Sequence, residues 1–325
     1  MVNRLALADR FIQAQLAKRP DIIAAWVGGS TVRGEATESS DIDVAFVIPG
    51  ESGQSFGARD GVDGWHDGIY YDAGYLSARE FADLETVMQN PFWATNMNYA
   101  LLRYDPTGHF TRLQEAVRTV YMEPAWLAKR LNYWLDIARI NVAGLQEAMT
   151  TADFLRLAEH ARWAAFAFAS LPLLRAGITP SSSRCLIQLG TVAPELQAQI
   201  YAFVGASTLS ADDVLTLEPW LHEWIALVDR TKHGYLLDYF VHKAVWLAGH
   251  GYPQMGFTCM FALSAGIGED CRQDAAKAAQ AIALAQRWQA AIHWTGEAVL
   301  QEKAAQAQSL LHAMETLATD LPAST

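Results

Sequence analysis

The segment VGGSTVRGEATESSDIDVAFVIPG, residues 27–50, constrains the fold more than any other part of this chain. An apolar run at residues 22–27 leads into it and a second run, at residues 44–48, leaves it, which predicts two buried strands joined by a polar connection. The glycine pair Gly28-Gly29 permits backbone torsions that residues with a Cβ resist. The N–H groups of such a turn, with the Ser30 hydroxyl, can cradle phosphate oxygens.

Two acids stand at the start of the second apolar run. Asp41 and Asp43 are two residues apart, so on a strand both side chains point to one face. Adjacent carboxylates repel each other unless a cation lies between them, and hard oxygen ligands favour Mg²⁺. Each fragment alone fits a surface turn beside an acidic strand end that touches only water. Their order and the flanking strands favour a phosphate cradle that faces a metal site, which is the equipment for moving a nucleotidyl group.

This spacing resembles the signature of the nucleotidyltransferase superfamily that includes DNA polymerase beta and the antibiotic nucleotidyltransferases. The signature is Gly-Ser, a gap of roughly ten residues, and Asp-x-Asp at the start of a strand, and it matches this chain at Gly29, Ser30, Asp41 and Asp43. The resemblance implies that Asp41 and Asp43 hold two Mg²⁺ ions and take part in catalysis. The nucleoside triphosphate, which we expect to be ATP, would then contact Gly28, Gly29, Ser30 and Ser40.

A third carboxylate is expected from the apolar run at residues 69–76, where Asp72 is an acid in the middle of a predicted strand. A buried charge there is costly without a partner. The superfamily places its third acid on a strand antiparallel to the Asp-x-Asp strand, facing the same metals, and the streptomycin-modifying members use it as a base. Asp72 matches this position, with Asp where those enzymes have Glu. It is therefore a candidate base or third metal ligand. Asp67 is the alternative acid, and an arginine ion pair is the alternative role for Asp72.

The chain as a whole predicts an α+β fold in two domains. Residues 1–115 alternate between helix and strand and are expected to form a nucleotidyltransferase domain with a small mixed sheet. Its expected helices cover residues 5–16 and 78–89, the second with a capping box from Ser77 to Glu80. Its expected strands cover residues 22–27, 42–48, 69–76 and 100–104, and the glycine-rich connection at residues 50–68 reads as mobile or ligand-facing.

Residues 116–325 are expected to form an all-α, acceptor-binding domain. Helical patterns cover residues 124–149, 151–176, 182–189, 194–204, 210–230, 235–248 and 273–317. A weaker resemblance to the antibiotic-modifying enzymes covers residues 162–184, where a helix, a short linker ending in Pro180 and a further helix follow one another. Those enzymes place a phosphate-contacting lysine directly after the proline. This chain has Ser181 there, so Arg184 is the candidate nucleotide-binding cation, with an ordinary surface arginine as the alternative.

Composition bears on the partner of the reaction. The 325 residues include 24 Lys and Arg against 35 Asp and Glu, a net charge of −11. Without a tract rich in Lys and Arg, the chain lacks the positively charged surface that binding a nucleic acid needs. Acidity suits a cationic or neutral small acceptor, although it also serves solubility alone. With the resemblance to the antibiotic-modifying enzymes, the expected acceptor is a small hydroxylated molecule such as an aminoglycoside-like antibiotic. Nucleotidylation of a protein or tRNA, as in toxin–antitoxin systems, and a non-catalytic nucleotide sensor are the competing functions.

The compartment is expected to be cytoplasmic. No apolar run approaches the ~18 residues of a membrane span, and the first residues do not resemble a secretory signal. The three cysteines are widely spaced and odd in number, which indicates neither a disulfide framework nor a zinc site. The oligomeric state is left open by the sequence.

Overall fold

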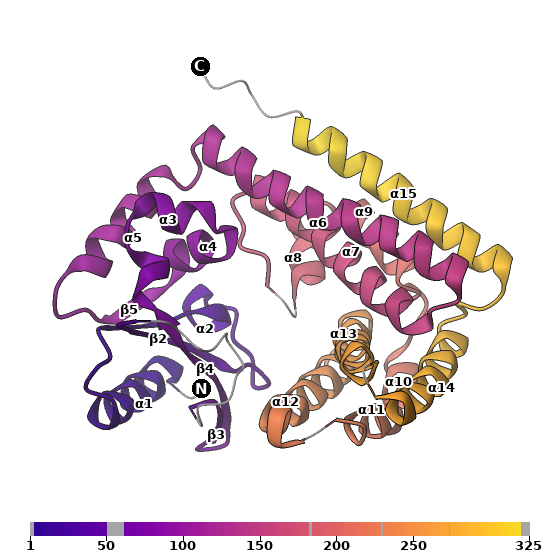
Figure 1. The fold of residues 1–325 in the computed structure, drawn as a ribbon, viewed down its shortest axis with the longest axis horizontal. Coiled ribbons are helices and arrows are strands. Elements are labelled where there is room, and N and C mark those ends of the chain that lie inside the picture. Colours follow the sequence, from indigo (N-terminus) through magenta and orange to yellow (C-terminus); the bar gives the residue numbers. More distant parts are fainter. Residues whose placement is uncertain (1–2, 51–61, 182–183, 229, 273, 320–325) are drawn as a thin grey trace. The chain divides into compact units, whose positions relative to one another are not determined.

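The computed structural model describes residues 3–50, 62–181, 184–228, 230–272 and 274–319. Its backbone contacts divide the chain into two compact units (Figure 1). The first unit comprises residues 1–129 with 231–239, and the second comprises residues 130–230 with 240–325. The fold is α+β, with a mixed sheet in the first unit and helices in the second. The domain division that the sequence places after residue 115 stays a prediction.

A five-stranded sheet forms the centre of the first unit, in the order β3-β4-β2-β1-β5. The strands are β1 (Ala24–Val27), β2 (Ile42–Ile48), β3 (Gly64–His66), β4 (Ile69–Ser77) and β5 (Leu101–Tyr104). Strand β2 runs parallel to β4, and the other neighbouring pairs are antiparallel. The helical elements are α1 (Arg4–Lys18), α2 (Gly29–Arg33), η1 (Ala78–Phe81), α3 (Leu84–Gln89), α4 (Pro91–Tyr99) and α5 (His109–Val120).

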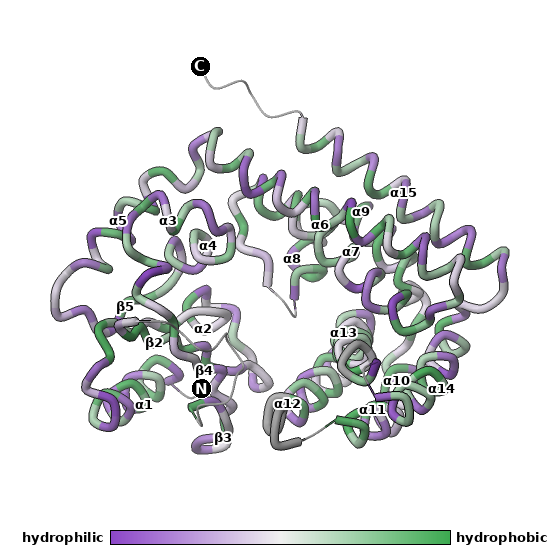
Figure 2. The backbone as a smooth tube through the Cα atoms, viewed as in Figure 1, coloured by the Kyte–Doolittle hydropathy of each residue, from purple (hydrophilic) through white to green (hydrophobic). Residues whose placement is uncertain are grey.

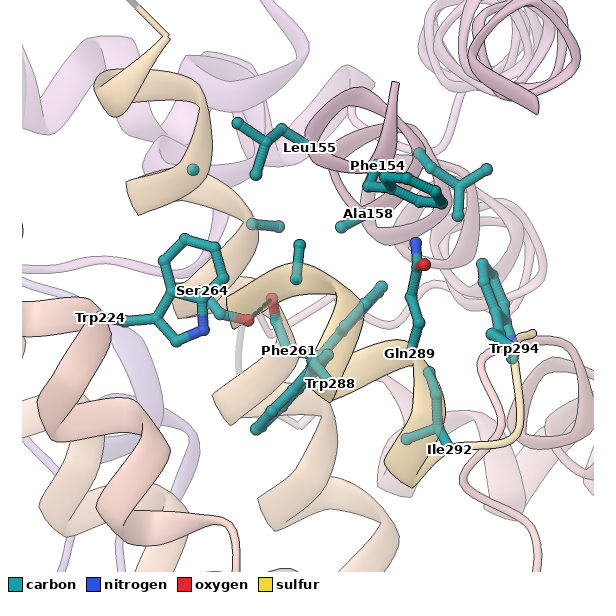
Figure 3. Close-up of a pocket in the computed structure, with 14 residues that line it drawn as sticks. Phe154, Leu155, Ala158, Trp224, Phe261, Ser264, Trp288, Gln289, Ile292 and Trp294 are labelled. Atoms are coloured by element: carbon teal, nitrogen blue, oxygen red, sulfur yellow. Dashed lines mark hydrogen bonds between the residues drawn. The ribbon is translucent and has the colours of Figure 1, made fainter. Parts of the chain in front are cut away.

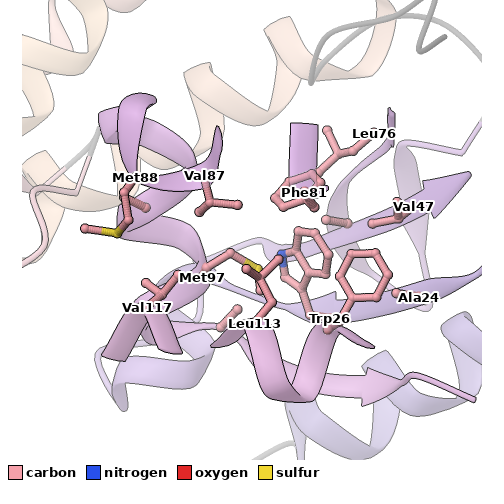
Figure 4. Close-up of a cluster of buried hydrophobic side chains, with 14 of the residues drawn as sticks. Ala24, Trp26, Val47, Leu76, Phe81, Val87, Met88, Met97, Leu113 and Val117 are labelled. Carbon is pink, nitrogen blue, oxygen red and sulfur yellow. The ribbon is translucent and has the colours of Figure 1, made fainter. Parts of the chain in front are cut away.

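Helices cover both faces of this sheet, and the alternation of side chains along β1 and β2 supplies an apolar core to each. On one face Trp26 packs edge-on against Phe81, with ring centroids 5.3 Å apart, within a cluster formed with α3, α4 and α5 (Figure 4). On the other face Phe46 contacts Phe11 of α1, with centroids 6.1 Å apart. Because both faces are buried, the strands read as continuous apolar runs, as the sequence indicates.

The second unit is all helical around α7 (Phe154–Arg175), which contacts α8, α9, α13, α14 and α15. Its helices are α8 (Cys185–Val192), α9 (Pro194–Phe203), α10 (Ala211–Leu215), α11 (Glu218–Ile225), α13 (Pro253–Cys271), α14 (Ala275–Ala291) and α15 (Glu297–Thr319). Helices α6 (Pro124–Thr151) and α12 (Arg230–Gly249) contribute residues to both units. Hydrophilic and hydrophobic residues alternate along α15 (Figure 2), where Ala307, Leu310, Leu311 and Met314 form the buried face. Within the described residues, no helix is both long and apolar enough to cross a membrane.

The orientation expected for the third-acid strand is wrong. The resemblance implies that it runs antiparallel to the Asp-x-Asp strand, but β4 is parallel to β2, with Asp72 opposite Asp43. The reason is the short strand β3, which the sequence analysis did not anticipate. It forms a hairpin with β4 and reverses the chain once more before β4 begins. Part of the expected glycine-rich connection, residues 51–61, lies outside the described residues.

Several expected helices also differ from the structure. The helix expected at residues 78–89 is divided, because Ser77 caps only η1 and Asp83 accepts from Thr86 N at 2.8 Å to start α3. The long patterns at residues 210–230 and 273–317 are each divided into two helices. Helix α13 was not expected, because the glycines at residues 249, 251 and 256 indicate a break between helices. At Gly256 a Cβ would lie 2.7 Å from the Ala244 carbonyl oxygen, so this glycine allows close packing on α12.

Candidate active site

Three acids meet beside the N-terminal end of β2, where this strand pairs with the first half of β4. Asp41, Asp43 and Asp72 each offer one carboxylate oxygen, and these oxygens all lie within 4.8 Å of one another. Asp43 and Asp72 are direct neighbours in the parallel register of β2 and β4, so their side chains share one face of the sheet. Asp41 stands immediately before β2 and is 9% exposed. The structure therefore brings together the three acids that the sequence analysis singled out.

This arrangement fits a divalent cation of the Mg²⁺ type. Ligands of Mg²⁺ lie at about 2.0–2.1 Å from the ion, so oxygens bound to one ion are about 3–4 Å apart, which is compatible with the 4.8 Å limit on the separations in this cluster. The donors are all carboxylate oxygens, the set that suits Mg²⁺, Ca²⁺ or Mn²⁺ rather than zinc. Ionised carboxylates at this separation repel one another, and a bound cation would offset that repulsion.

Gly29 is required by the position of Asp43. Its φ is +60°, in the left-handed region that favours glycine. A Cβ at this residue would lie 1.6 Å from Asp43 Oδ2, far inside van der Waals contact. The neighbouring Gly28 N–H donates to the Asp43 carbonyl oxygen at 2.9 Å, which joins the turn to β2. The glycine pair thus holds the backbone directly against the acid cluster, and the expected turn continues as the short helix α2 with Ser30 buried in it.

Ser40 shapes the loop that precedes Asp41. It is 3% exposed, and its hydroxyl oxygen accepts a hydrogen bond from Thr37 N at 2.9 Å. The Arg4 guanidinium of α1 donates to the carbonyl oxygens of Thr37 and Ser40, at 2.7 and 2.6 Å. These bonds anchor the loop to α1 and so position Asp41, a role for Arg4 that the sequence analysis missed. A nucleotide contact by Ser40 stays a prediction.

Tyr70 is a second residue beside the cluster that the sequence analysis missed. It stands two positions before Asp72 on β4, is 1% exposed, and donates its hydroxyl proton to Asp63 Oδ2 at 3.2 Å. Burial raises the pKa of Tyr70 well above its usual range, and the negative charges of Asp63, Asp72 and Asp41 raise it further. Tyr70 therefore stays protonated in the field of the cluster. Strand alternation could have indicated Tyr70, whereas Asp63 lies before β3 and carried no pattern.

Asp67 and Arg184 are the remaining candidates. Asp67 is an exposed residue with φ +50° between β3 and β4, and it is not among the three acids of the cluster. Arg184 belongs to the helical unit, directly before α8, and is 9% exposed, so it is not an ordinary surface arginine. Its positive charge acts on Cys259, whose pKa is nevertheless raised by burial. A contact of Arg184 with a nucleotide stays a prediction.

The match to a known protein family agrees with the acid cluster. Residues 9–89, which contain all three acids and the Gly28–Ser30 turn, match the family described as nucleotidyltransferase domain. Among solved structures, the chain is similar to a nucleotidyltransferase-like protein from Exiguobacterium sibiricum 255-15, with 11% identity, coverage of 83% of this chain and 81% of that chain, and a TM-score of 0.35. No curated protein matches. The N-terminal region of this chain is therefore a nucleotidyltransferase domain of the superfamily that its Gly-Ser and Asp-x-Asp residues indicate.

Proposed function

We propose that the protein transfers a nucleoside monophosphate from a nucleoside triphosphate, with ATP as the first candidate, to a hydroxyl of a small acceptor, in a reaction that depends on Mg²⁺. The observation that carries this proposal is the convergence of Asp41, Asp43 and Asp72, with carboxylate oxygens within 4.8 Å, inside a nucleotidyltransferase domain. A domain that only bound a nucleotide would have no need for three mutually repelling acids.

Asp41 and Asp43 are the residues that would bind Mg²⁺, as either one ion or two. A bound cation would supply positive charge against the triphosphate oxygens and the charge that develops on them during transfer. Gly29 and Ser30 lie beside these acids, where backbone N–H groups and a hydroxyl suit phosphate oxygens. The turn would therefore contact the phosphate oxygens directly, and the acids would contact them through the metal.

Asp72 has two possible roles in this scheme, a general base or a third ligand. As a base it takes the proton of the acceptor hydroxyl while that oxygen forms a bond to the α-phosphorus. The bond from the α-phosphorus to the bridging oxygen of the β-phosphate breaks, and pyrophosphate leaves with the electron pair. As a ligand, Asp72 would instead contribute to metal affinity, so binding and turnover measurements separate the two roles.

A small hydroxylated acceptor of the aminoglycoside type fits the charge of the chain. The net charge of −11 disfavours a polyanionic acceptor and favours a neutral or cationic one. Incubation with α-labelled ATP, Mg²⁺ and a panel of aminoglycosides should label one class of acceptor and release pyrophosphate. Labelling of tRNA or of a protein under the same conditions would instead support the macromolecular alternative.

The metal assignment has its own test, which needs no acceptor. Mg-ATP should raise the melting temperature of the protein, while ATP with EDTA should leave it almost unchanged, because binding to the folded state alone stabilises it. Asp41→Asn and Asp43→Asn should remove the shift and leave the fold intact or slightly more stable. Glu85→Gln, which removes an exposed acid of α3 outside the cluster, should keep the shift. An equal shift with and without Mg²⁺ would favour the sensor function.

A further inference from the structure

Two cavities in the helical unit share part of their walls. The inner cavity, of about 10 Å³, lies among α7, α11, α13 and α14 (Figure 3). The outer one, of about 610 Å³, is formed by the end of α6, the end of α14 and the start of α15. Phe154, Gln289 and Trp294 line both cavities. These three side chains therefore form the partition between the small inner space and a space large enough for a small molecule.

Gln289 is the polar group at this partition. It is 6% exposed, and its Nε2 has no hydrogen-bond partner among the described residues. In Figure 3 its amide points toward Phe154, across the cavity. A buried amide left without a partner costs about 1–3 kcal/mol. An acceptor atom supplied by a ligand would offset that cost.

The indole N–H groups around the inner cavity also lack hydrogen-bond partners among the described residues. Trp224, Trp288 and Trp294 are 1–2% exposed, and within the described part of the chain the Nε1 of each has no partner. The inner cavity is at the lower limit of the space that one water molecule needs. One water accepts only two hydrogen bonds, so it would leave part of this donor set unsatisfied. The site as a whole is short of acceptor oxygens.

The lining of the outer cavity indicates the chemical class of the ligand. Its polar side chains are mainly neutral amides and hydroxyls, supplied by Gln146, Thr150, Gln286, Thr295 and Gln301. Among the described residues that line either cavity there is no Lys, Arg or His to neutralise an anion. The one acid, Glu297, already accepts from Gln301 Nε2 at 3.1 Å. Neutral groups that donate and accept match hydroxyls, which do the same.

We propose that this pair of cavities is a binding site for a neutral, polyhydroxylated molecule of the saccharide class. Phe154, which is half-buried, offers apolar ring surface to the C–H face of a sugar ring, and Gln289 Nε2 donates to a ring or hydroxyl oxygen. All lining residues belong to the helical unit, so binding requires neither Mg²⁺ nor a nucleotide. The site is therefore independent of the transferase function proposed above.

Glucose, maltose and sucrose at millimolar concentration are the probes that test this site. Saturation-transfer NMR should detect one or more of them on the full-length protein, and Trp fluorescence should change with the same affinity. Gln289→Leu should weaken binding roughly ten-fold, the loss of one hydrogen bond to a buried donor. Gln280→Leu, an exposed glutamine on the same helix, should leave it unchanged.

Two further variants and two charged sugars test the site even if Gln289→Leu folds poorly. Ala304→Trp, which fills the outer cavity from α15, should abolish saccharide binding, while Asp41→Asn should preserve it. Equal or tighter binding of glucosamine or glucose 6-phosphate would overturn the assignment to neutral ligands. Absence of binding by all the sugars, a crystal soak that shows only ordered water, or binding that survives Ala304→Trp would overturn the site itself.

Discussion

Replacing Gly29 with alanine tests how the acid cluster is held together. A Cβ at this residue would lie 1.6 Å from Asp43 Oδ2, against about 3.4 Å for ordinary contact, so the carboxylate must retreat by roughly 2 Å or the turn must move. The contact cannot be relieved by a flexible side-chain end, because Asp43 is short and stands in β2. Gly29→Ala should therefore disturb the metal site before it disturbs the fold.

The cost of the substitution has two separable parts. An alanine at φ +60° costs about 1–2 kcal/mol of backbone strain. Gly34 is a matched control, because its φ is +72° and a Cβ there would meet nothing within 4 Å. Gly34→Ala should lose the same ~1–2 kcal/mol of unfolding free energy, with no effect on Asp43. Only Gly29→Ala adds the displacement of a carboxylate, and a 1 Å misplacement can lower a rate about 10²-fold.

The assay compares both variants with the parent protein. Urea denaturation measures the free energy of unfolding, and the Mg-ATP-dependent rise in melting temperature measures the metal site. Gly34→Ala should keep the shift, whereas Gly29→Ala should lose most of it and, once an acceptor is known, at least about 10²-fold in turnover. If Gly29→Ala showed the same Mg-ATP-dependent shift and the same turnover as Gly34→Ala, the position of Asp43 would not depend on Gly29. That result would refute the reasoning.

Three further predictions concern Asp72, Tyr70 and the cysteines. Asp72→Asn should cut turnover roughly 10²–10⁴-fold with little change in Mg-ATP affinity if it is the base, whereas a large loss of affinity in titration calorimetry would make it a ligand. Tyr70→Phe should lower the free energy of unfolding by about 1–2 kcal/mol, measured in urea, because Asp63 loses its donor; an unchanged value would show that the bond contributes nothing. Burial raises the pKa of Cys185 to about 12 and that of Cys259 to about 11, so at pH 8 both thiols stay protonated and a thiol-specific dye should label neither until the protein is denatured. Rapid labelling of the folded protein would contradict the burial argument. Since both pKa values are raised on folding, the stabilising contribution of the two protonated thiols is present below pH 9 and is lost as the pH rises toward 11–12. Measurements of the free energy of unfolding between pH 8 and 11 would detect this loss.

The local elements around the acid cluster were predictable from the sequence. Strand β2 covers the expected residues 42–48, and the first helix and the strands β1, β4 and β5 were anticipated to within a few residues. The reason is that a strand buried on both faces requires a continuous run of apolar residues, and a turn requires turn-forming residues at its ends. Both patterns are visible within a few neighbouring residues. The candidates Asp41, Asp43 and Asp72 were visible for the same reason, as acids next to or inside apolar runs.

Features that depend on distant partners were decided only by the tertiary structure. The parallel pairing that sets Asp43 opposite Asp72 follows from β3, a three-residue strand too short to leave a pattern. Helix α13 was missed because Gly256 reads as a breaker, whereas in the fold its missing side chain makes room for the backbone of α12. Periodicity reports which residues are apolar, but it carries no information about which segment will lie against them.

The candidate site shows the same division between sequence and structure. The residue types of the acid cluster and of its glycine turn were determined by the sequence, because carboxylates and a Cβ-free backbone have a defined chemistry wherever they occur. Their distances, the clash that makes Gly29 necessary, and the supporting bonds of Arg4 and Tyr70 were decided by the tertiary structure alone. These depend on contacts between residues far apart in the chain, such as Arg4 with Ser40, and such contacts exist only once the sheet and helices have packed.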